Sequence, residues 1–358
     1  MHFERLDLKS GDWGQQLERL PGAMVCQRLA WLSFLERSQH GEPIAALLWE
    51  DGSVVGVFAG MVVTKFGLRI LGSPFPGWTT SYMGLNVAEG VSRNRAIRAL
   101  VEFAFDDLHC IHLEMMDRHL TLGDLDGLKA RHRMFRSWEV DLDENDEKLM
   151  RTFSRACRWG IRTAAKNGVV VEEAHDDEFI DEYYAQLRAV FALQRLIPTY
   201  PRERVAQLIS ALAPSGQLLL LRARTSDGEP AATGIFHAVD SQRAYGWGFA
   251  SWPRTRHLHP NELLMLHAMS WWRARGFTIM DLAGSGDYKK KYHPRPIAVP
   301  WIQVSKYPVI PPLRDAAQRS FRLRQRVLGR LAAKPSPLPN ESAVLDVELD
   351  VDTAIPDR

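Results

Sequence analysis

The sequence predicts a mixed α/β protein made of two tandem domains of the same kind. Three observations predict it. The chain has 358 residues, which is longer than one ordinary hydrophobic core usually accommodates. Its content of 46% hydrophobic and 25% charged residues is typical of a globular protein. The third observation is that one order of elements, hairpin, strand, helix and strand, occurs in both halves.

The first half contains the first copy of this order. Asp51 and Gly52 separate two runs of β-forming residues, which is a strong hairpin signal. The loop 72–78 holds prolines and glycines that leave little room for regular structure, and we expect it to wall a cleft. The predicted elements are a partly helical segment to residue 40, strands 45–49, 54–58 and 61–71, helix 93–108 and strand 110–115.

The second half repeats the order after an acidic stretch at 139–147. Asp227 and Gly228 again mark a hairpin turn. The predicted elements are helices 147–167 and 177–193, strands 217–223, 231–238 and 243–249, helix 260–275 and a strand near 277–282. We expect an N-terminal domain at 1–140, a C-terminal domain at 141–310, a basic helix at 311–334 and a disordered acidic tail at 335–358.

Bulk properties limit the classes of function. The formal net charge is only +2, so attraction to a charged partner must come from local clusters. Three cysteines at no metal-like spacing favour a reducing compartment and argue against a disulfide framework. The N-terminus has no signal-like apolar core, and the longest apolar run is too short to cross a membrane. We therefore expect a cytoplasmic location.

Residues 276–292 (GFTIMDLAGSGDYKKKY) are the most informative stretch. A buried strand runs into a Gly-rich turn, which is followed by lysines between Tyr288 and Tyr292. Aromatic residues four positions apart can fix such a segment to the core, while a lysine such as Lys289 faces a pocket. A strand followed by a solvated charge run is the alternative at this point.

The helix predicted at 147–167 carries a stripe of positive charge. Its basic residues are spaced four, three, four and four apart, so they share one face: Arg151, Arg155, Arg158, Arg162 and Lys166. Like charges on one face repel one another, and a phosphate or pyrophosphate would relieve that repulsion. A solvated basic face, or ion pairs with the acidic 139–147 stretch, would equally account for it.

Further candidates surround the helix predicted to begin at Pro260. Free N–H groups in its first turn, near Asn261, can bind an anion, although an ordinary helix start looks the same in sequence. Trp247 frames the loop before this helix, as a substrate-site wall or as core packing. His257 and His259 lack a third ligand at suitable spacing, so we predict no metal site.

Three motifs in order resemble one family. The segment 154–169 resembles the S-R-x-x-R-x-x-I-R-x-A-x-x-x-G-V segment of FemAB-like and CelD/BcsL-type proteins of the GNAT superfamily. Residues 259–264 are similar to the x-P-x-x-L-L helix start of that family. Residues 276–282 and 288–292 are similar to its G-x-x-x-x-D-x strand and [FY]-K-x-x-[FYW] ending. The resemblance covers about 147–295.

The resemblance implies two tandem GNAT-like domains, the first of them degenerate, and an acyl- or aminoacyltransferase acting on a cell-envelope or exopolysaccharide precursor. It implies that Lys289 stabilises an oxyanion, with Tyr288 beside it as the second catalytic candidate. The substrate-binding candidates are Arg155, Arg158, Arg162, Asn261, Tyr292 and Trp247. The acceptor would carry phosphate or sugar, and the donor would be an acyl-CoA or a charged tRNA.

The sequence departs from the wider superfamily at 254–258, where Arg-Thr-Arg-His-Leu replaces the R/Q-x-x-G-x-G/A loop that cradles coenzyme A. The donor therefore stays open. An inactive GNAT-fold scaffold is the alternative to an enzyme. The basic helix 311–334 would then contact an anionic membrane or RNA, although packing on the protein itself is the interpretation that we favour.

Overall fold

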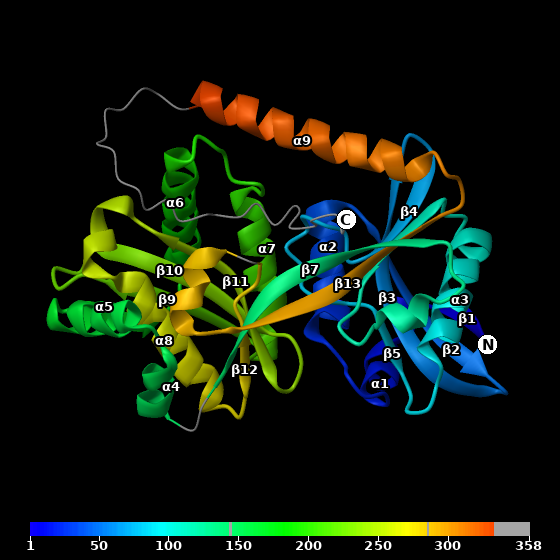
Figure 1. The fold of residues 1–358 in the computed structure, drawn as a ribbon, viewed down its shortest axis with the longest axis horizontal. Helices are drawn as coiled ribbons and strands as arrows, with labels where there is room; N and C mark the ends of the chain where they lie inside the picture. The colour runs from blue at the N-terminus through cyan, green and yellow to red at the C-terminus, as the bar shows by residue number, and fades with distance from the viewer. Residues whose placement is uncertain (143–144, 285, 333–358) are drawn as a thin grey trace.

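The computed structural model describes residues 1–142, 145–284 and 286–332. The chain forms one long mixed sheet with helices on both faces (Figure 1). The strands are β1 (His2–Leu6), β2 (Glu42–Glu50), β3 (Ser53–Lys65), β4 (Leu68–Ser73), β5 (Leu85–Val87), β6 (His112–Met116), β7 (Ala130–Asp141), β8 (Val170–Glu173), β9 (Leu218–Arg224), β10 (Pro230–Ala238), β11 (Arg243–Ser251), β12 (Ile279–Asp281) and β13 (Arg295–Ser305). The helices are α1 (Trp13–Glu18), α2 (Leu29–Gln39), α3 (Arg93–Glu102), α4 (Asp146–Thr152), α5 (Arg155–Lys166), α6 (Glu178–Leu193), α7 (Arg202–Leu212), α8 (Pro260–Arg273) and α9 (Ile310–Ala332).

The order of strands confirms the predicted tandem repeat. It runs β1-β2-β3-β4-β6-β13-β7-β12-β11-β10-β9-β8, with β5 paired to β3 beside this path. In the first half β4 and β6 pair in parallel, with α3 between them in the chain. In the second half β11 and β12 pair in parallel, with α8 between them. The strand pairs found elsewhere in this described sheet are antiparallel.

The last strand of each half joins the sheet of the other half. Strand β7 pairs with β12, where Ile279 lies opposite Asp141. Strand β13, from the end of the second half, pairs with β6, where Trp301 lies opposite Met116. Strands β7 and β13 also pair with each other along most of their length, as Figure 1 shows at the centre of the molecule. The two halves are therefore joined through backbone hydrogen bonds as well as through side chains.

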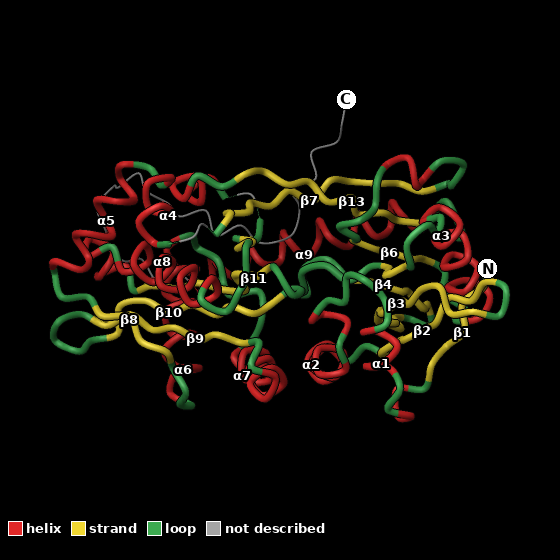
Figure 2. The backbone as a smooth tube through the Cα atoms, turned by 90° about the horizontal axis from the view of Figure 1, so that it is seen from below, coloured by secondary structure: helices red, strands yellow, loops and turns green. Residues whose placement is uncertain are grey.

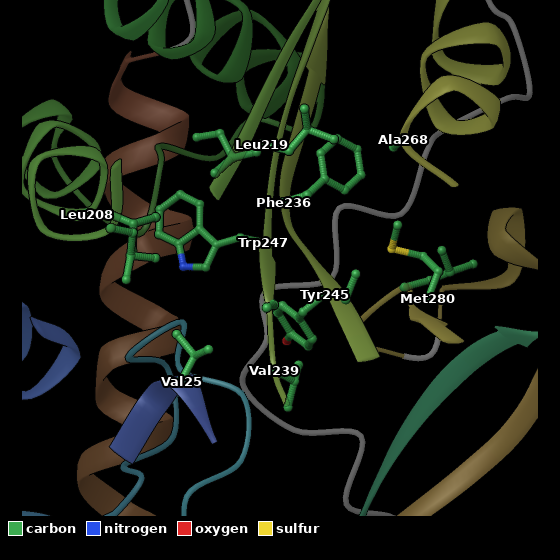
Figure 3. Packing of buried hydrophobic residues seen from close by; sticks show 14 of the residues in the cluster. Val25, Leu208, Leu219, Phe236, Val239, Tyr245, Trp247, Ala268 and Met280 are labelled. Carbon is green, nitrogen blue, oxygen red and sulfur yellow. The ribbon is translucent and has the colours of Figure 1, made fainter. Parts of the chain in front are cut away.

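Helices cover both faces of this sheet, as Figure 2 shows. Because side chains alternate across a strand, β2 supplies both layers. Ala45 and Leu47 belong to the core that includes Trp31 of α2. Ala46 and Leu48 belong to the smaller core that includes Leu100 of α3. The larger core continues into the second half through α6, α7 and α8, and Figure 3 shows part of it around Trp247 and Leu208.

The first predicted hairpin is present, and its turn has the expected backbone. Asp51 and Gly52 both have positive φ angles, of 50° and 76°. Two successive residues with positive φ match the right-handed twist of the strands they connect, which is why Asp-Gly is a strong signal. Pairing begins directly at the turn, with Glu50 opposite Ser53.

The prediction of a single helix over 147–167 is wrong. Two helices, α4 and α5, occupy this region, because the backbone of Phe153 is extended and Ser154 caps a new helix. The Ser154 Oγ accepts a hydrogen bond from the Cys157 N–H at 3.1 Å, as an N-cap residue does. Arg151 therefore belongs to α4, and the basic stripe on α5 has four members rather than five.

The predicted basic helix is present as α9, which lies across both halves at the top of Figure 1. It is fixed to the protein at its N-terminal end. Asp315 accepts hydrogen bonds from Arg131 at 3.2 Å and Arg133 at 3.0 Å, and Arg314 forms an ion pair with Glu114. The tail predicted to be disordered at 335–358 lies outside the described residues, as do residues 333 and 334.

Candidate active site

The residues after β12 form a short 3₁₀ helix, Asp287–Tyr292, that brings the predicted aromatic and basic side chains to one place. Tyr292 is buried and packs edge-on against Phe153, with ring centroids 5.4 Å apart. The Ser154 N–H donates to the Lys291 carbonyl at 2.9 Å. The cap of α5 therefore also holds the 3₁₀ helix in place, which explains why the S-R-x-x-R and Y-K-x-x-Y motifs occur together.

Lys289 lies on the inner side of this 3₁₀ helix and is only 8% exposed. Its ammonium group donates a hydrogen bond to the Ala283 carbonyl and lies 5.4 Å from the centroid of the Tyr288 ring. Ala283 has a φ of 58°, an unusual conformation for a residue with a side chain, and it directs the backbone after β12 back toward the lysine. The ammonium group is thus held on the inner side of the 3₁₀ helix, beside the Tyr288 ring.

A narrow pocket of about 60 Å³ contains four of the predicted site residues. They are Lys289, Tyr288, Tyr292 and Asn261. The remaining lining residues are Val190, Phe249, Ala250, Ser251, Leu264, Met265, Leu282 and Lys291. The volume holds only a few water molecules, and the walls are mostly apolar. The arrangement suits a small acyl group beside a buried cation rather than a whole large substrate.

Helix α8 supplies one wall of this pocket and begins where predicted. Pro260 is its first residue, and His259 before it has a φ of 54°. The Asn261 side chain donates to the Ser251 hydroxyl at 3.0 Å, which fixes β11 to the start of α8. Glu262 pairs with Lys291 at 2.8 Å. Gly160 of α5 lets the two helices approach, since a Cβ there would lie 3.2 Å from the His259 ring.

The three arginines of α5 do not line this pocket, as far as the described residues show. Arg155 and Arg162 are exposed on the outer face of the helix. Arg158 turns back and donates to the carbonyls of Arg151 and Phe153. It thereby satisfies acceptors that the end of α4 leaves open, which is a structural role for the second arginine of the motif.

Trp247 lies away from this pocket, in the core between the halves. Its indole N–H donates to the Thr79 carbonyl at 2.8 Å, and its ring packs on Tyr200 at 5.1 Å. Figure 3 shows it beside Leu208 of α7. In sequence this tryptophan could be either a site wall or part of the core, and the contacts describe core packing.

A second pocket, of about 400 Å³, lies beneath α9. The loop predicted to wall a cleft contributes Phe75, Pro76, Gly77 and Trp78, and α9 contributes Arg314, Ala317, Gln318 and Phe321. The remaining lining residues are Gln39, Val63, Lys65, Ile70, Thr79, Thr199 and Arg204. Aromatic rings and three basic side chains in one concave site fit a ligand that carries a planar or apolar part and an anion.

Arg204 is the residue of this second pocket that sequence reasoning missed. Burial lowers the pKa of its guanidinium below the ordinary value. Its Nε has no hydrogen-bond partner among the described residues, and the guanidinium lies 5.8 Å from the Tyr200 ring centroid. A desolvated cation without a carboxylate partner is costly unless a ligand supplies an anion. One arginine in an ordinary amphipathic helix gives no such signal in sequence.

Asp281, the acidic residue of the strand motif, is completely buried where β12 meets β7. It accepts hydrogen bonds from the Tyr82 and Ser137 hydroxyls, at 2.8 and 2.6 Å, and from the Ala283 N–H. Burial raises the pKa of this carboxyl above its ordinary value, against the lowering effect of these bonds. Asp117, which follows β6 in the first half, likewise accepts a hydrogen bond from the backbone N–H two residues later, that of His119. The duplication thus extends to this residue.

The described part of the chain contains no group of three or more His, Cys, Asp or Glu side chains that could hold a metal ion. None of the helices described has the length and apolar content needed to cross a bilayer.

Known proteins share this architecture. Residues 149–292 match the family model described as an acetyltransferase (GNAT) domain. The solved structure of FemX is similar with a TM-score of 0.67 and 15% identity, covering 84% of this chain and 97% of that one. The structure of L-PGS from Bacillus licheniformis is similar with a TM-score of 0.52 and 14% identity, covering 93% of this chain and 99% of that one. A tandem GNAT protein from the clavulanic acid biosynthesis pathway has a TM-score of 0.53 and 14% identity, covering 86% of this chain and 99% of that one. No curated protein sequence matches the chain.

The duplicated sheet and the enclosed lysine pocket thus define a protein of the tandem GNAT fold. The match over residues 149–292 identifies the second half as a GNAT domain. As a whole, the chain is similar in fold to FemX and to a tandem GNAT protein.

Proposed function

We propose that this protein is an acyltransferase that transfers an acyl or aminoacyl group to a phosphate- or sugar-containing precursor of the cell envelope or an exopolysaccharide, in the cytoplasm or next to the inner membrane. The observation that carries the proposal is the enclosed ammonium of Lys289 in a pocket that admits little more than an acyl group. The FemX-like fold and the three sequence motifs support the envelope substrate class.

In this reaction the acceptor amine or hydroxyl attacks the acyl carbonyl, and negative charge develops on the carbonyl oxygen. The Lys289 ammonium, which donates to the Ala283 carbonyl in the free protein, would donate to that oxygen instead. Tyr288 and Tyr292 would wall the reacting group and exclude water. Asn261 would hold the substrate at the start of α8. Positioning and one charged donor suffice for acyl transfer, so a nucleophilic triad is not required.

The donor depends on how well the region before α8 fits coenzyme A. Residues Pro253–Leu258 form a 3₁₀ helix in place of a glycine-rich loop. The Thr255 and His259 N–H groups donate to the Trp252 and Arg256 carbonyls. These amides are occupied and do not fit a pyrophosphate cradle, so an acyl-CoA donor would have to be bound by other groups. A charged tRNA remains the alternative donor.

Two places suit the phosphate of the acceptor. The second pocket offers Arg204, Lys65 and Arg314 beside aromatic rings, whereas α5 offers the exposed Arg155 and Arg162. The pocket is favoured, because its arginine is desolvated while the α5 residues are open to solvent. Arg158 would then support the active site by holding α4 to α5 rather than by touching substrate.

The test is transfer of a labelled group from acetyl-CoA, a long-chain acyl-CoA or charged tRNA to a panel of nucleotide-linked sugars. We expect Lys289→Met to lower kcat by about 10²–10³ with little change in thermal stability. Lys290→Met is the matched control, because Lys290 is exposed on the same 3₁₀ helix and pairs with Asp287 at 2.6 Å. Equal activity of the two variants would remove the role assigned to Lys289.

The alternative function is an inactive GNAT-fold scaffold, and the occupied amides before α8 favour it. A scaffold would bind a nucleotide-linked sugar without turning over any donor in the panel. Wild-type turnover with any one donor would exclude this alternative.

A further inference from the structure

Helix α9 has one face fixed to the protein and another face without cover among the described residues. Near its N-terminal end, Arg314 pairs with Glu114, and Asp315 with Arg131 and Arg133. Near the other end the helix touches the segment that follows α6, where a Cβ on Gly329 would lie 2.0 Å from a backbone oxygen. Contacts at both ends fix the rotation of the helix about its axis, and with it the face on which each described side chain lies.

The uncovered face carries an apolar stripe. Leu313, Leu323 and Val327 are 58%, 63% and 47% exposed. Ala316 and Ser320 continue the same line, so the spacing is three, four, three and four residues. That spacing places side chains along one side of a helix. Large apolar side chains exposed in a row are uncommon unless something covers them.

Positive charge flanks this stripe on both sides. Helical geometry places Arg319 and Arg326 along one edge and Arg324 along the other, and all three side chains are exposed. Asp315, the sole acidic residue of α9 in the sequence, points to the opposite face, where it pairs with two arginines. The outer surface is therefore apolar in the middle and cationic at both edges.

We propose that this outer face of α9 docks on the surface of an anionic lipid bilayer. A second copy of the helix would bring arginine rows against each other, which disfavours self-association. A surface-bound helix buries an apolar stripe among acyl chains while arginines at its edges reach the phosphates, and this pattern matches α9. The charge of the lipid headgroups complements the three arginines. Tyr307 and Val309, just before α9, are exposed apolar residues as well.

Docking by this face would also fix the position of the second pocket relative to the membrane. Phe321 and Gln318 line that pocket from α9. An α-helix with its side chains is about 10 Å across, so the pocket would lie roughly that far from the lipid. A precursor presented at the membrane surface would then be close to the second pocket. This consequence for the precursor rests on the proposed function. The docking itself is independent of catalysis.

The experiment is co-sedimentation of the full chain with two kinds of vesicle, one of phosphatidylcholine alone and one also containing phosphatidylglycerol. The first variant is Leu313→Ser, Leu323→Ser and Val327→Ser together. The second is Arg319→Gln, Arg324→Gln and Arg326→Gln together. A matched control replaces three exposed apolar residues elsewhere, Phe66, Leu68 and Leu122, by serine. Thermal unfolding is measured for every protein.

We expect the wild type and the control to bind the phosphatidylglycerol vesicles at low salt. Both α9 variants should bind at least about tenfold less, since each cation near an anionic surface contributes roughly fivefold. The proposal is overturned if the wild type sediments with neither vesicle, or equally with both. It is also overturned if either variant that unfolds like the wild type binds undiminished. Acyl transfer to a water-soluble acceptor should be unchanged in both variants. A negative result for membrane docking would therefore not contradict the proposed function.

Discussion

Burying the Arg204 guanidinium costs the folded protein stability, and this cost implies that a bound anion offsets it. Its guanidinium lies desolvated in the second pocket, and no described carboxylate pairs with it. We predict that Arg204→Leu leaves the melting temperature unchanged or higher, while it abolishes the stabilisation that a nucleotide-linked sugar gives to the wild type. Thermal unfolding with and without the sugar measures both effects.

Arg202→Leu is the control for this prediction. Arg202 begins the same helix, but it is only partly buried and pairs with the Asp181 carboxylate. Its replacement should preserve the ligand effect. Loss of stability in Arg204→Leu, together with an unchanged ligand shift, would mean that this arginine serves the fold alone.

His237 makes stability depend on pH. It is buried between Trp31 and Tyr245, and burial lowers the pKa of its imidazole to about 4. The neutral form is favoured in the folded state, so its stability contribution is complete above pH 6.5 and is lost as the pH falls toward 4. Between pH 7 and pH 5 the loss is about 2 kcal/mol.

Urea denaturation at the two pH values measures this loss. His237→Phe keeps an aromatic ring but cannot titrate, so it should reduce the pH dependence by that amount. His175→Gln, at an exposed position, should retain the wild-type dependence. An identical dependence in His237→Phe and in the wild type would contradict the assignment.

At the level of elements, the junction between α4 and α5 connects the cap of a helix to the active site. Ser154 caps α5 through its side chain, and its N–H donates to the Lys291 carbonyl. We predict that Ser154→Ala costs about 1 kcal/mol and also lowers activity, because the 3₁₀ helix that carries Lys289 packs on this junction.

Ser154→Asp tests the reason for that cost. Aspartate caps a helix as well as serine does, so this variant should recover most of the stability in urea denaturation. If alanine and aspartate gave equal stability, the cap would not be the cause of the loss.

The same junction shows what sequence can and cannot predict. Local sequence signals predicted three features that the structure contains. They are the Asp51-Gly52 turn, the start of α8 at its proline and the repeated order of elements. The break at Phe153 was missed, because continuous helical spacing of arginines outweighed a serine that can also begin a helix. Where each arginine points depends on the carbonyls that end α4, which spacing alone does not specify.

Long-range pairing is the part of the fold that local patterns could not predict. Strands β7 and β13 are absent from the elements predicted from the sequence, and each of them pairs with a strand of the other half. The two pockets are likewise assembled from distant segments. Lys289 and the tyrosines beside it were identified through a motif, whereas Arg204 meets the 72–78 loop only after the halves have packed together.

At the level of the whole molecule, the exchange of β7 and β13 makes two domains in sequence into one unit in structure. Buried charges strengthen the junction: Glu139 of β7 pairs with Arg118 at 2.6 Å and also with Arg295 of β13. Arg118 in turn lies over the Tyr82 ring at 4.9 Å. Neither half can unfold without taking a central strand from the other.

We therefore predict one cooperative unfolding transition for the whole chain, in calorimetry and in hydrogen exchange of both halves. Arg118→Met should cost roughly 3 kcal/mol, because it leaves buried carboxylates with fewer partners. It should lower the transition of both halves equally, although Arg118 belongs to the first half. Arg98→Met, at an exposed position of α3, is the matched control and should leave the transition in place. Two separate transitions, or protection lost in one half alone, would show that the exchanged strands do not couple the halves.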